Sequence, residues 1–338
     1  MNRTEEKYSR EIIIREMMDT VDIIKSFNLD LTSNLAEIIK NRKRILFTGE
    51  GSSRIFPAKN AILKAFKWGL EIPIFAEGAH QASLYDMTDG VVFCASNSGR
   101  TKELIHLTKR LSRTNPKVIG LTSQRNTPLE KVADSTFILN CGTERAVAAT
   151  KSVMEQALFY DSVVLHLMDR LHELDLASLA GMVEEALMLE IDDHLVDMVL
   201  EASFIYLAGY NDGVAEELTL KANEILGKKS DFLAGTYAVH GIEEVMNRDE
   251  LVILINPIPE EIDKFKEVLV DGVQLNLIAI SHHETPFPTI LVPDAGEFSG
   301  YVFLAAVWNL YVEAGLKLGV NMSEAELARK VGNEVPEE

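Results

Sequence analysis

Small polar residues gather in the segment ASNSGRTKELIHL, between an apolar run and a stretch with helical spacing. They are Ser96, Asn97, Ser98, Gly99 and Thr101. If the second stretch is a helix, its first turn has backbone N–H groups without partners and a partial positive charge. Hydroxyl groups add donors, and glycine lets the backbone curl around an oxyanion. This combination predicts a cradle for a phosphate or sulfonate group.

A second turn of the same kind follows an earlier apolar run, in the sequence GEGSSRIF. It offers Gly51, Ser52 and Ser53 ahead of another helical stretch. Neither turn has the GxxxxGK[ST] pattern of a nucleotide phosphate loop or the GxGxxG pattern of a dinucleotide site. Serine and threonine are also ordinary helix caps. With two hydroxyl-rich turns in one unit, an anion site is as good an interpretation as a pair of caps.

Apolar runs rich in β-branched residues alternate with segments of helical periodicity along most of the chain. Such alternation is typical of parallel sheets covered on both faces, so we expect an α/β fold. Ligands of such sheets bind at the carboxyl ends of the strands, where both polar turns fall. The expected strands are 44–48, 73–76, 91–95, 117–122 and 136–140, then 204–208, 251–255, 275–280 and 289–292; expected helices include 55–68, 101–113 and 149–170.

The two series of strands correspond at an offset near 160 residues. ILFTG at 45–49 matches IYLAG at 205–209, and Ser123 and Ser281 lie 158 residues apart in a second matching pair. We therefore expect two copies of one αβα unit, of which the first has the hydroxyl-rich strand ends. The predicted parts are an N-terminal helical lead-in at 1–34, a first domain at 35–170, a helical connector at 171–195, a second domain at 196–325 and a C-terminal tail at 326–338.

The chain of 338 residues has 33 Lys and Arg against 52 Asp and Glu, a formal net charge of −19. This balance argues against binding to nucleic acid or to an anionic membrane surface. The acidity lies in the second half, because residues 1–170 have 24 basic and 20 acidic residues and residues 171–338 have 9 and 32. The predicted anion site therefore lies in the slightly basic part.

The segment 301–320 is apolar but is interrupted by Asn309, Glu313 and Lys317 at four-residue spacing. This spacing predicts a buried helix with one wet stripe rather than a membrane span. The N-terminal sequence MNRTEEKYSREII lacks the apolar core of a signal peptide, so we expect a cytoplasmic location.

The cysteines and histidines of the sequence do not form a pattern that is typical of a metal site. Cys94 and Cys141 are too few for a disulfide framework or a Cys-rich zinc site, and we expect both to be buried in strands. The pair His282–His283 has no further ligand at suitable spacing, so we expect no metal site.

Four motifs together resemble the sugar isomerase (SIS) domain family: GEGSS, ASNSGRT, GLTSQRNTPLEKVAD and ERAVAATKS. The resemblance extends over about residues 35–338. In tandem arrangement the chain is similar to the isomerase half of glucosamine-6-phosphate synthase and to stand-alone phosphosugar isomerases and deaminases. The resemblance implies two flavodoxin-like αβα units. It assigns substrate binding to Gly51, Ser52, Ser53, Ser96, Asn97, Ser98, Thr101, Val147, Ala148, Thr150 and Lys151.

The segment EELTLKANEILGKKSDFLAGTYAVHG in the second copy resembles the catalytic segment of the family. The resemblance makes Glu224 and His240, which are 16 residues apart, catalytic, and makes Glu217 and Lys221 upstream sugar contacts. The tail ELARKVGNEV resembles the C-terminal segment whose lysine enters the family's site. That lysine corresponds to Lys330.

Three positions depart from the family pattern. Glu50 stands where the synthase has cysteine, Arg100 stands where a glutamate is usual, and Ile242 replaces the proline of the family's His-Gly-Pro. Arg100 adds positive charge beside the predicted anion site and is counted among the substrate-binding residues. This charge is compatible with an anionic group other than the usual 6-phosphate, such as a 6-sulfonate. The sequence has no glutaminase domain, so we expect no glutamine-driven amination.

The resemblance implies an aldose–ketose isomerase of a 6-phosphorylated or similarly anionic sugar, which opens the ring and passes through a cis-enediol without a metal or organic cofactor. His240 would open the ring, because imidazole titrates near working pH. Glu224 would move the proton between C1 and C2, and Lys330 would stabilise the enediolate charge. The family usually completes its site across a dimer interface, with the histidine supplied by the neighbour, so we expect a homodimer with shared active sites.

Three alternatives stay open. The chain could be a deaminating isomerase of an amino-sugar phosphate, or an isomerase of a 6-sulfo sugar. It could also be a non-catalytic regulator that binds phosphosugars, although the presence of Glu224, His240 and Lys330 argues against that interpretation.

Overall fold

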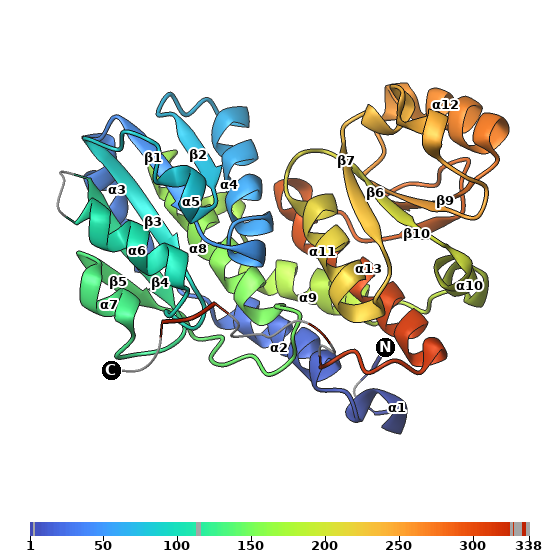
Figure 1. Ribbon diagram of the computed structural model, residues 1–338, viewed down its shortest axis with the longest axis horizontal. Helices are drawn as coiled ribbons and strands as arrows, with labels where there is room; N and C mark the ends of the chain where they lie inside the picture. Colours follow the sequence, from blue (N-terminus) through green and yellow to red (C-terminus); the bar gives the residue numbers. More distant parts are fainter. Residues whose placement is uncertain (3, 113–115, 325–326, 328–332, 336–338) are drawn as a thin grey trace. The chain divides into compact units, whose positions relative to one another are not determined.

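The computed structural model describes residues 1–2, 4–112, 116–324, 327 and 333–335. The chain divides into two compact units, each built on one parallel five-stranded sheet (Figure 1). The first-sheet unit comprises Asp22–Arg145, Ala149–Leu176 and the described residues of the tail, and the second-sheet unit comprises Met1–Val21, Ala146–Ala148 and the residues from Ala177 to Glu324. The predicted α/β fold with two parallel sheets is confirmed.

The first sheet has the strand order β2-β1-β3-β4-β5, with every neighbouring pair parallel. The apolar runs of the sequence predict all five of its strands to within two residues at either end. They are β1 (Arg44–Thr48), β2 (Ile74–Glu77), β3 (Gly90–Ala95), β4 (Lys117–Thr122) and β5 (Ser135–Ile138).

Helices cover both faces of the first sheet, which explains why its central strands are continuous apolar runs. On one face Phe47 of β1 stacks on Tyr160 with ring centroids 4.1 Å apart. On the other face Leu46, Val92 and Cys94 pack in a second buried cluster. The first face carries η1 (Leu29–Thr32), α3 (Ser33–Lys40), α4 (Phe56–Lys67) and α8 (Lys151–Leu167); the second carries α5 (Ala79–Ala82), α6 (Lys102–Leu111) and α7 (Pro128–Val132).

The second sheet has the order β10-β9-β8-β6-β7, which is the order of the first sheet with its strands counted from the other edge. One of its strands, Ser230–Ala234, is missing from the sequence-based prediction. Its sequence SDFLA is largely accessible because it forms an edge of the sheet, so it lacks the apolar run that marks the others. The strands are β6 (Ile205–Gly209), β7 (Ser230–Ala234), β8 (Leu251–Ile255), β9 (Asn276–Ser281) and β10 (Thr289–Leu291).

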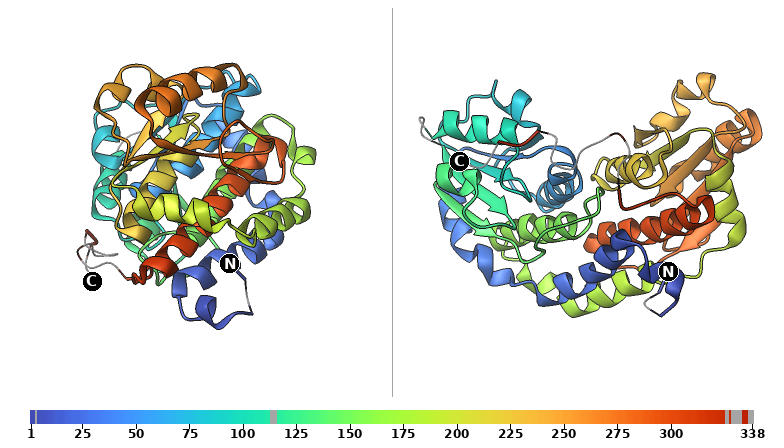
Figure 2. Two further views of the ribbon diagram at one scale, coloured as in Figure 1. Left: turned by 90° about the vertical axis from the view of Figure 1, so that its right-hand side faces the viewer. Right: turned by 60° about the horizontal axis from the view of Figure 1, so that its bottom comes forward.

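Regular helices pack on one face of the second sheet, and short helical segments cover the other (Figure 2). The regular helices on this face are α10 (Asp193–Glu201), α11 (Val214–Leu226) and α13 (Ser299–Leu318). Four further helices come earlier in the chain: α1 (Glu6–Ser9), α2 (Ile12–Ser26), η3 (Leu171–Glu173) and α9 (Leu176–Leu187). The short segments are η4 (Tyr237–Val239), η5 (Ile242–Val245), η6 (Pro259–Glu261), α12 (Ile262–Phe265) and the π-helix η7 (Lys266–Val273); η8 (Gly296–Phe298) leads into α13.

All but the last two residues of the apolar segment 301–320 lie in α13, which is buried along most of its length, as predicted. The expected wet stripe is wrong at Asn309, which has no exposed surface. Its amide donates to the carbonyl of Leu189 at 2.8 Å, and its oxygen accepts from the N-terminal ammonium at 2.7 Å. Asn309 therefore binds polar groups of the protein beyond the end of α9 and at the N-terminus instead of water. Within the described ranges, no helix is long and apolar enough to cross a membrane.

Both cysteines are buried, but only Cys94 lies in a strand. Cys141 follows β5 in a turn, because that strand ends at Ile138.

Candidate functional site

The two hydroxyl-rich turns follow neighbouring strands of the first sheet. The segment 96–101, called the anion loop here, joins β3 to α6, and Gly51–Ser53 form the short helix η2 between β1 and α4. Strands β1 and β3 are parallel neighbours in register. Both turns therefore lie at the carboxyl edge of the sheet, where ligands of such sheets bind.

The polar groups of the anion loop are not used as a helix cap. Thr101 directly precedes α6, but its side chain makes no capping hydrogen bond. Its hydroxyl lies instead 2.9 Å from the hydroxyl of Ser96. The backbone N–H groups of Asn97, Ser98 and Thr101 donate to no atom of the described residues. This arrangement leaves donors available for an oxyanion and favours the anion site over the capping interpretation.

Gly99 is required by the shape of the anion loop. Its φ is +64°, in the left-handed region, and a Cβ there would lie 2.5 to 2.7 Å from three side-chain atoms of Thr127. The carbonyl of Gly99 also accepts a hydrogen bond from the backbone of Leu129 at 3.1 Å. The loop is therefore packed tightly against the start of α7.

We expect Gly99→Ala to weaken the binding of inorganic phosphate by about tenfold or more. The left-handed backbone costs a non-glycine residue about 1–2 kcal/mol, and the overlap with Thr127 displaces the loop further. Isothermal titration calorimetry with phosphate measures the effect. Gly69→Ala is the matched control, because Gly69 has a φ of +82° and a Cβ added there would meet nothing within 4 Å. Equal phosphate affinity in the two variants would contradict this prediction.

Asn97 is held through its carbonyl and its side chain. Its carbonyl accepts from the hydroxyl of Thr122 at 3.0 Å and from the backbone N–H of Ser123 at 3.1 Å. Its side-chain amide donates to Glu144 at 3.3 Å, and its oxygen accepts from the thiol of Cys141 at 3.6 Å. The amide is thus occupied within the protein, and the N–H group is what Asn97 offers to a ligand.

Part of the C-terminal tail pairs with the end of the anion loop. The N–H of Val335 donates to the carbonyl of Arg100 at 2.9 Å, and the N–H of Lys102 donates to the carbonyl of Asn333 at 3.0 Å. Val335 also packs against the buried cluster beneath α6. Lys330, the predicted lysine of the tail, lies outside the described residues.

The predicted turn 147–151 belongs to both units. Val147 and Ala148 are part of the second-sheet unit, where the N–H of Val147 donates to the carbonyl of Ser323 at 2.9 Å. Lys151 begins α8 in the first-sheet unit, and its ammonium lies 3.5 Å from the carbonyl of Thr143.

Three charged side chains form a row on α11, because their spacing of three and four residues places them on one helix face. The ammonium of Lys221 lies 3.0 Å from Glu217 and 2.8 Å from Glu224. The side chains of Lys221 and Glu217 have no exposed surface, whereas that of Glu224 is 24% exposed. Burial by itself lowers the pKa of Lys221, but the two carboxylates outweigh it and raise that pKa above the ordinary 10.5.

This row has two consequences for the predicted site. Glu224 is the member of the row that solvent reaches, as a group that acts on a ligand must be. Glu217 and Lys221, predicted as sugar contacts, are enclosed, and their charged groups contact each other and Glu224. Their role toward a sugar stays a prediction.

His240 follows η4 and is exposed. The ammonium of Lys264 on α12 lies 3.4 Å from its Nε2 atom. An ammonium can only donate, so this contact is compatible with the tautomer that carries its proton on Nδ1. No hydrogen bond joins His240 to Glu224 in the part of the chain that the structure describes.

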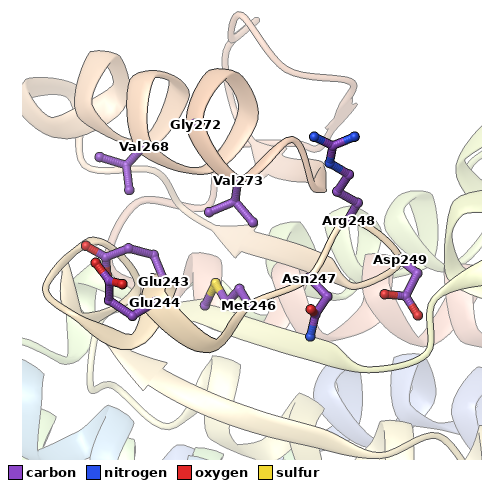
Figure 3. A pocket seen from close by; sticks show the side chains of 9 residues that line it. All are labelled: Glu243, Glu244, Met246, Asn247, Arg248, Asp249, Val268, Gly272 and Val273. Carbon is purple, nitrogen blue, oxygen red and sulfur yellow. The ribbon is translucent and has the colours of Figure 1, made fainter.

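A separate groove lies on the face of the second sheet that carries η5 and the π-helix (Figure 3). It has a volume of about 770 Å³ and contains none of the predicted site residues. Its lining consists of Glu243, Glu244, Met246, Asn247, Arg248, Asp249, Val268, Gly272 and Val273.

Comparison with known protein families identifies the family of the segment that contains the anion loop. Residues 38–166 match the family model of the SIS domain. This part of the chain is a SIS domain. The match includes η2, the anion loop and most of α8, so the loop geometry described above belongs to the SIS domain itself.

Two curated relatives share part of the sequence. An uncharacterized HTH-type transcriptional regulator of Clostridium perfringens is 32% identical over 113 residues, which cover 33% of this chain and 40% of the relative. The isomerizing glutamine–fructose-6-phosphate aminotransferase of Sulfurisphaera tokodaii is 24% identical over 251 residues, which cover 72% of this chain and 41% of the relative. The chain therefore spans less than half the length of either relative.

The fold beyond the SIS domain is also shared with a solved structure. Tagatose-6-phosphate ketose/aldose isomerase from Escherichia coli superposes with a TM-score of 0.77 and 16% identity, covering 96% of this chain and 99% of that chain. The chain thus shares the fold of this solved structure over nearly its whole length.

Proposed function

We propose that this protein is an aldose–ketose isomerase of a 6-phosphorylated or similarly anionic sugar. The observation that carries the proposal is the anion loop, whose Thr101 hydroxyl does not cap α6 and whose three backbone N–H groups have no acceptor among the described residues. The likeness to an isomerizing aminotransferase and to a ketose/aldose isomerase supports the same reaction class.

The proposed chemistry divides between two kinds of group. The anion loop binds the charged end of the sugar, and the hydroxyls of Ser52 and Ser53 bind its sugar hydroxyls. Glu224 takes the proton from C2 of the open-chain aldose and returns it to C1, while the hydroxyl proton passes from O2 to O1, and the aldehyde becomes a ketone through an enediolate. His240 moves the proton that opens the ring, and Lys330 stabilises the enediolate oxygen. The working form that we propose is a cytoplasmic homodimer with shared active sites.

Incubation with candidate 6-phospho and 6-sulfo sugars in D2O tests the proposal. Deuterium at C1 or C2, detected by NMR, is the expected result, because the carboxylate exchanges its proton with solvent between the two transfers. Preference for the sulfonate series identifies the 6-sulfo sugar alternative. Tight binding of a sugar phosphate without exchange over a broad panel would contradict an isomerase and favour a phosphosugar-binding regulator.

A deaminating isomerase is a second candidate, and Glu50 favours it. This residue directly precedes η2, and its Oε1 atom accepts from the N–H of Ala79 at 2.9 Å. A carboxylate at the sugar-binding turn suits a substrate with a cationic amine. An ammonia assay on amino-sugar phosphates separates the two activities, since release of ammonia supports the deaminase.

A further inference from the structure

Glu144 is a buried carboxylate on which several donors of the SIS domain converge. It lies between β5 and α8 and is 4% exposed. Its Oε1 atom accepts from the backbone N–H of Thr150 at 2.7 Å and from that of Ser152 at 3.3 Å. Its Oε2 atom accepts from the hydroxyl of Ser152 at 2.5 Å and from the amide of Asn97 at 3.3 Å. A carboxylate has about four lone-pair positions, so these four donors use its full capacity.

These contacts connect the start of α8 to the anion loop. Three of the four donors belong to Thr150 and Ser152 at the start of α8, and the fourth belongs to Asn97. The carbonyl of Asn97 is already fixed by Thr122 and Ser123. Its side chain contacts Glu144 at 3.3 Å, the carbonyl of Gly142 at 3.5 Å and the thiol of Cys141 at 3.6 Å, and Glu144 is the shortest and only charged contact of the three. The N–H group of Asn97, which has no partner in the described part of the chain, is thereby held in one direction.

We propose that Glu144 is a positioning residue that holds Asn97 and the anion loop in the geometry that binds the sugar's anionic group. The inference rests on the anion loop of the proposed function but not on the isomerase reaction. Glu144 acts through Asn97. A carboxylate is needed here because every neighbouring group is a donor, whereas a glutamine would turn its own N–H₂ toward one of them.

Glu144→Gln tests this role, with Ser152→Ala as the matched control. The glutamine side chain keeps one oxygen that can accept from the backbone of α8. Its N–H₂ group, however, faces the N–H₂ group of Asn97, so two donors meet where a donor and an acceptor met before. Ser152→Ala removes a contact of the same carboxylate without touching Asn97. We expect Glu144→Gln to weaken phosphate binding about tenfold to a hundredfold, as measured by calorimetry, and Ser152→Ala to change it less than about threefold.

The outcomes separate this inference from the proposed function. Equal phosphate affinity in the wild type and Glu144→Gln would overturn the positioning role while leaving the isomerase proposal intact. Failure of the wild type to bind phosphate would overturn both, since the anion loop is their common premise. Phosphate binding without deuterium exchange in any sugar would contradict only the isomerase.

A second pair of variants covers the case in which Glu144→Gln does not fold. Asn97→Asp places two carboxylates at the 3.3 Å contact, so we expect a lower melting temperature. The double variant Asn97→Asp/Glu144→Gln reverses donor and acceptor and should recover most of the loss. A double variant no more stable than Asn97→Asp alone would show that the two side chains do not interact and would overturn the inference.

Discussion

Glu224→Gln is expected to lower the rate of deuterium exchange into the sugar by about a hundredfold to ten-thousandfold, the usual contribution of a positioned general base. An amide cannot take the proton from C2, so the enediolate does not form. The fold should be retained, because the amide oxygen can still accept from Lys221, and Lys221 keeps Glu217 as an ion-pair partner at 3.0 Å. Exchange at C1 and C2 in D2O, followed by NMR, measures the rate, and calorimetry measures sugar binding, which should change less than a few-fold.

Glu201→Gln is the control for this variant. Glu201 ends α10 in the same unit, is exposed, and has no predicted role. It should exchange deuterium at the wild-type rate. If Glu224→Gln also exchanged near that rate, Glu224 would not be the base, whatever else the protein does with the sugar.

Lys221→Met is expected to destabilise the second-sheet unit by about 3–5 kcal/mol, because removing one partner of a buried ion pair leaves the other charge without compensation. Glu217 would then be a buried carboxylate with no exposed surface, and Glu224 would lose its contact at 2.8 Å. Urea unfolding followed by circular dichroism measures the change. The double variant Glu217→Gln/Lys221→Met should recover part of the loss, since it removes the uncompensated charge.

Lys229→Met is the control on the same unit, and as an exposed substitution it should change stability by less than about 0.5 kcal/mol. The effect of pH is a further check on the ion pair. The pKa of Lys221 is raised in the folded protein, so its contribution is complete below the ordinary pKa of 10.5 and is lost only as pH rises above that value. The difference between wild type and Lys221→Met should therefore not fall between about pH 7 and pH 9. A difference that falls over this range would show that Lys221 does not act as the buried cation described.

Much of the fold could be predicted from the sequence because burial leaves a local pattern. Strands covered on both faces, such as β3 and β8, are continuous apolar runs that can be recognised without their neighbours. The edge strand β7 could not be recognised in this way, because its sequence SDFLA is largely accessible and it is defined by pairing with β6. The prediction for Asn309 is wrong for a related reason, since helical spacing cannot distinguish a polar residue that faces water from one that faces a backbone carbonyl of the protein.

The sequence by itself determined the alternation of strands and helices, the two hydroxyl-rich turns, and their place at strand ends. Those features depend on neighbours along the chain. Only the tertiary structure decided that Thr101 does not cap α6, that Asn97 is held by Glu144, and that Lys221 and Glu217 are enclosed while Glu224 reaches solvent. The physical reason is that a donor or a charge is satisfied by whichever group the fold brings to it. In the case of Asn97 that group is 47 residues away in the chain.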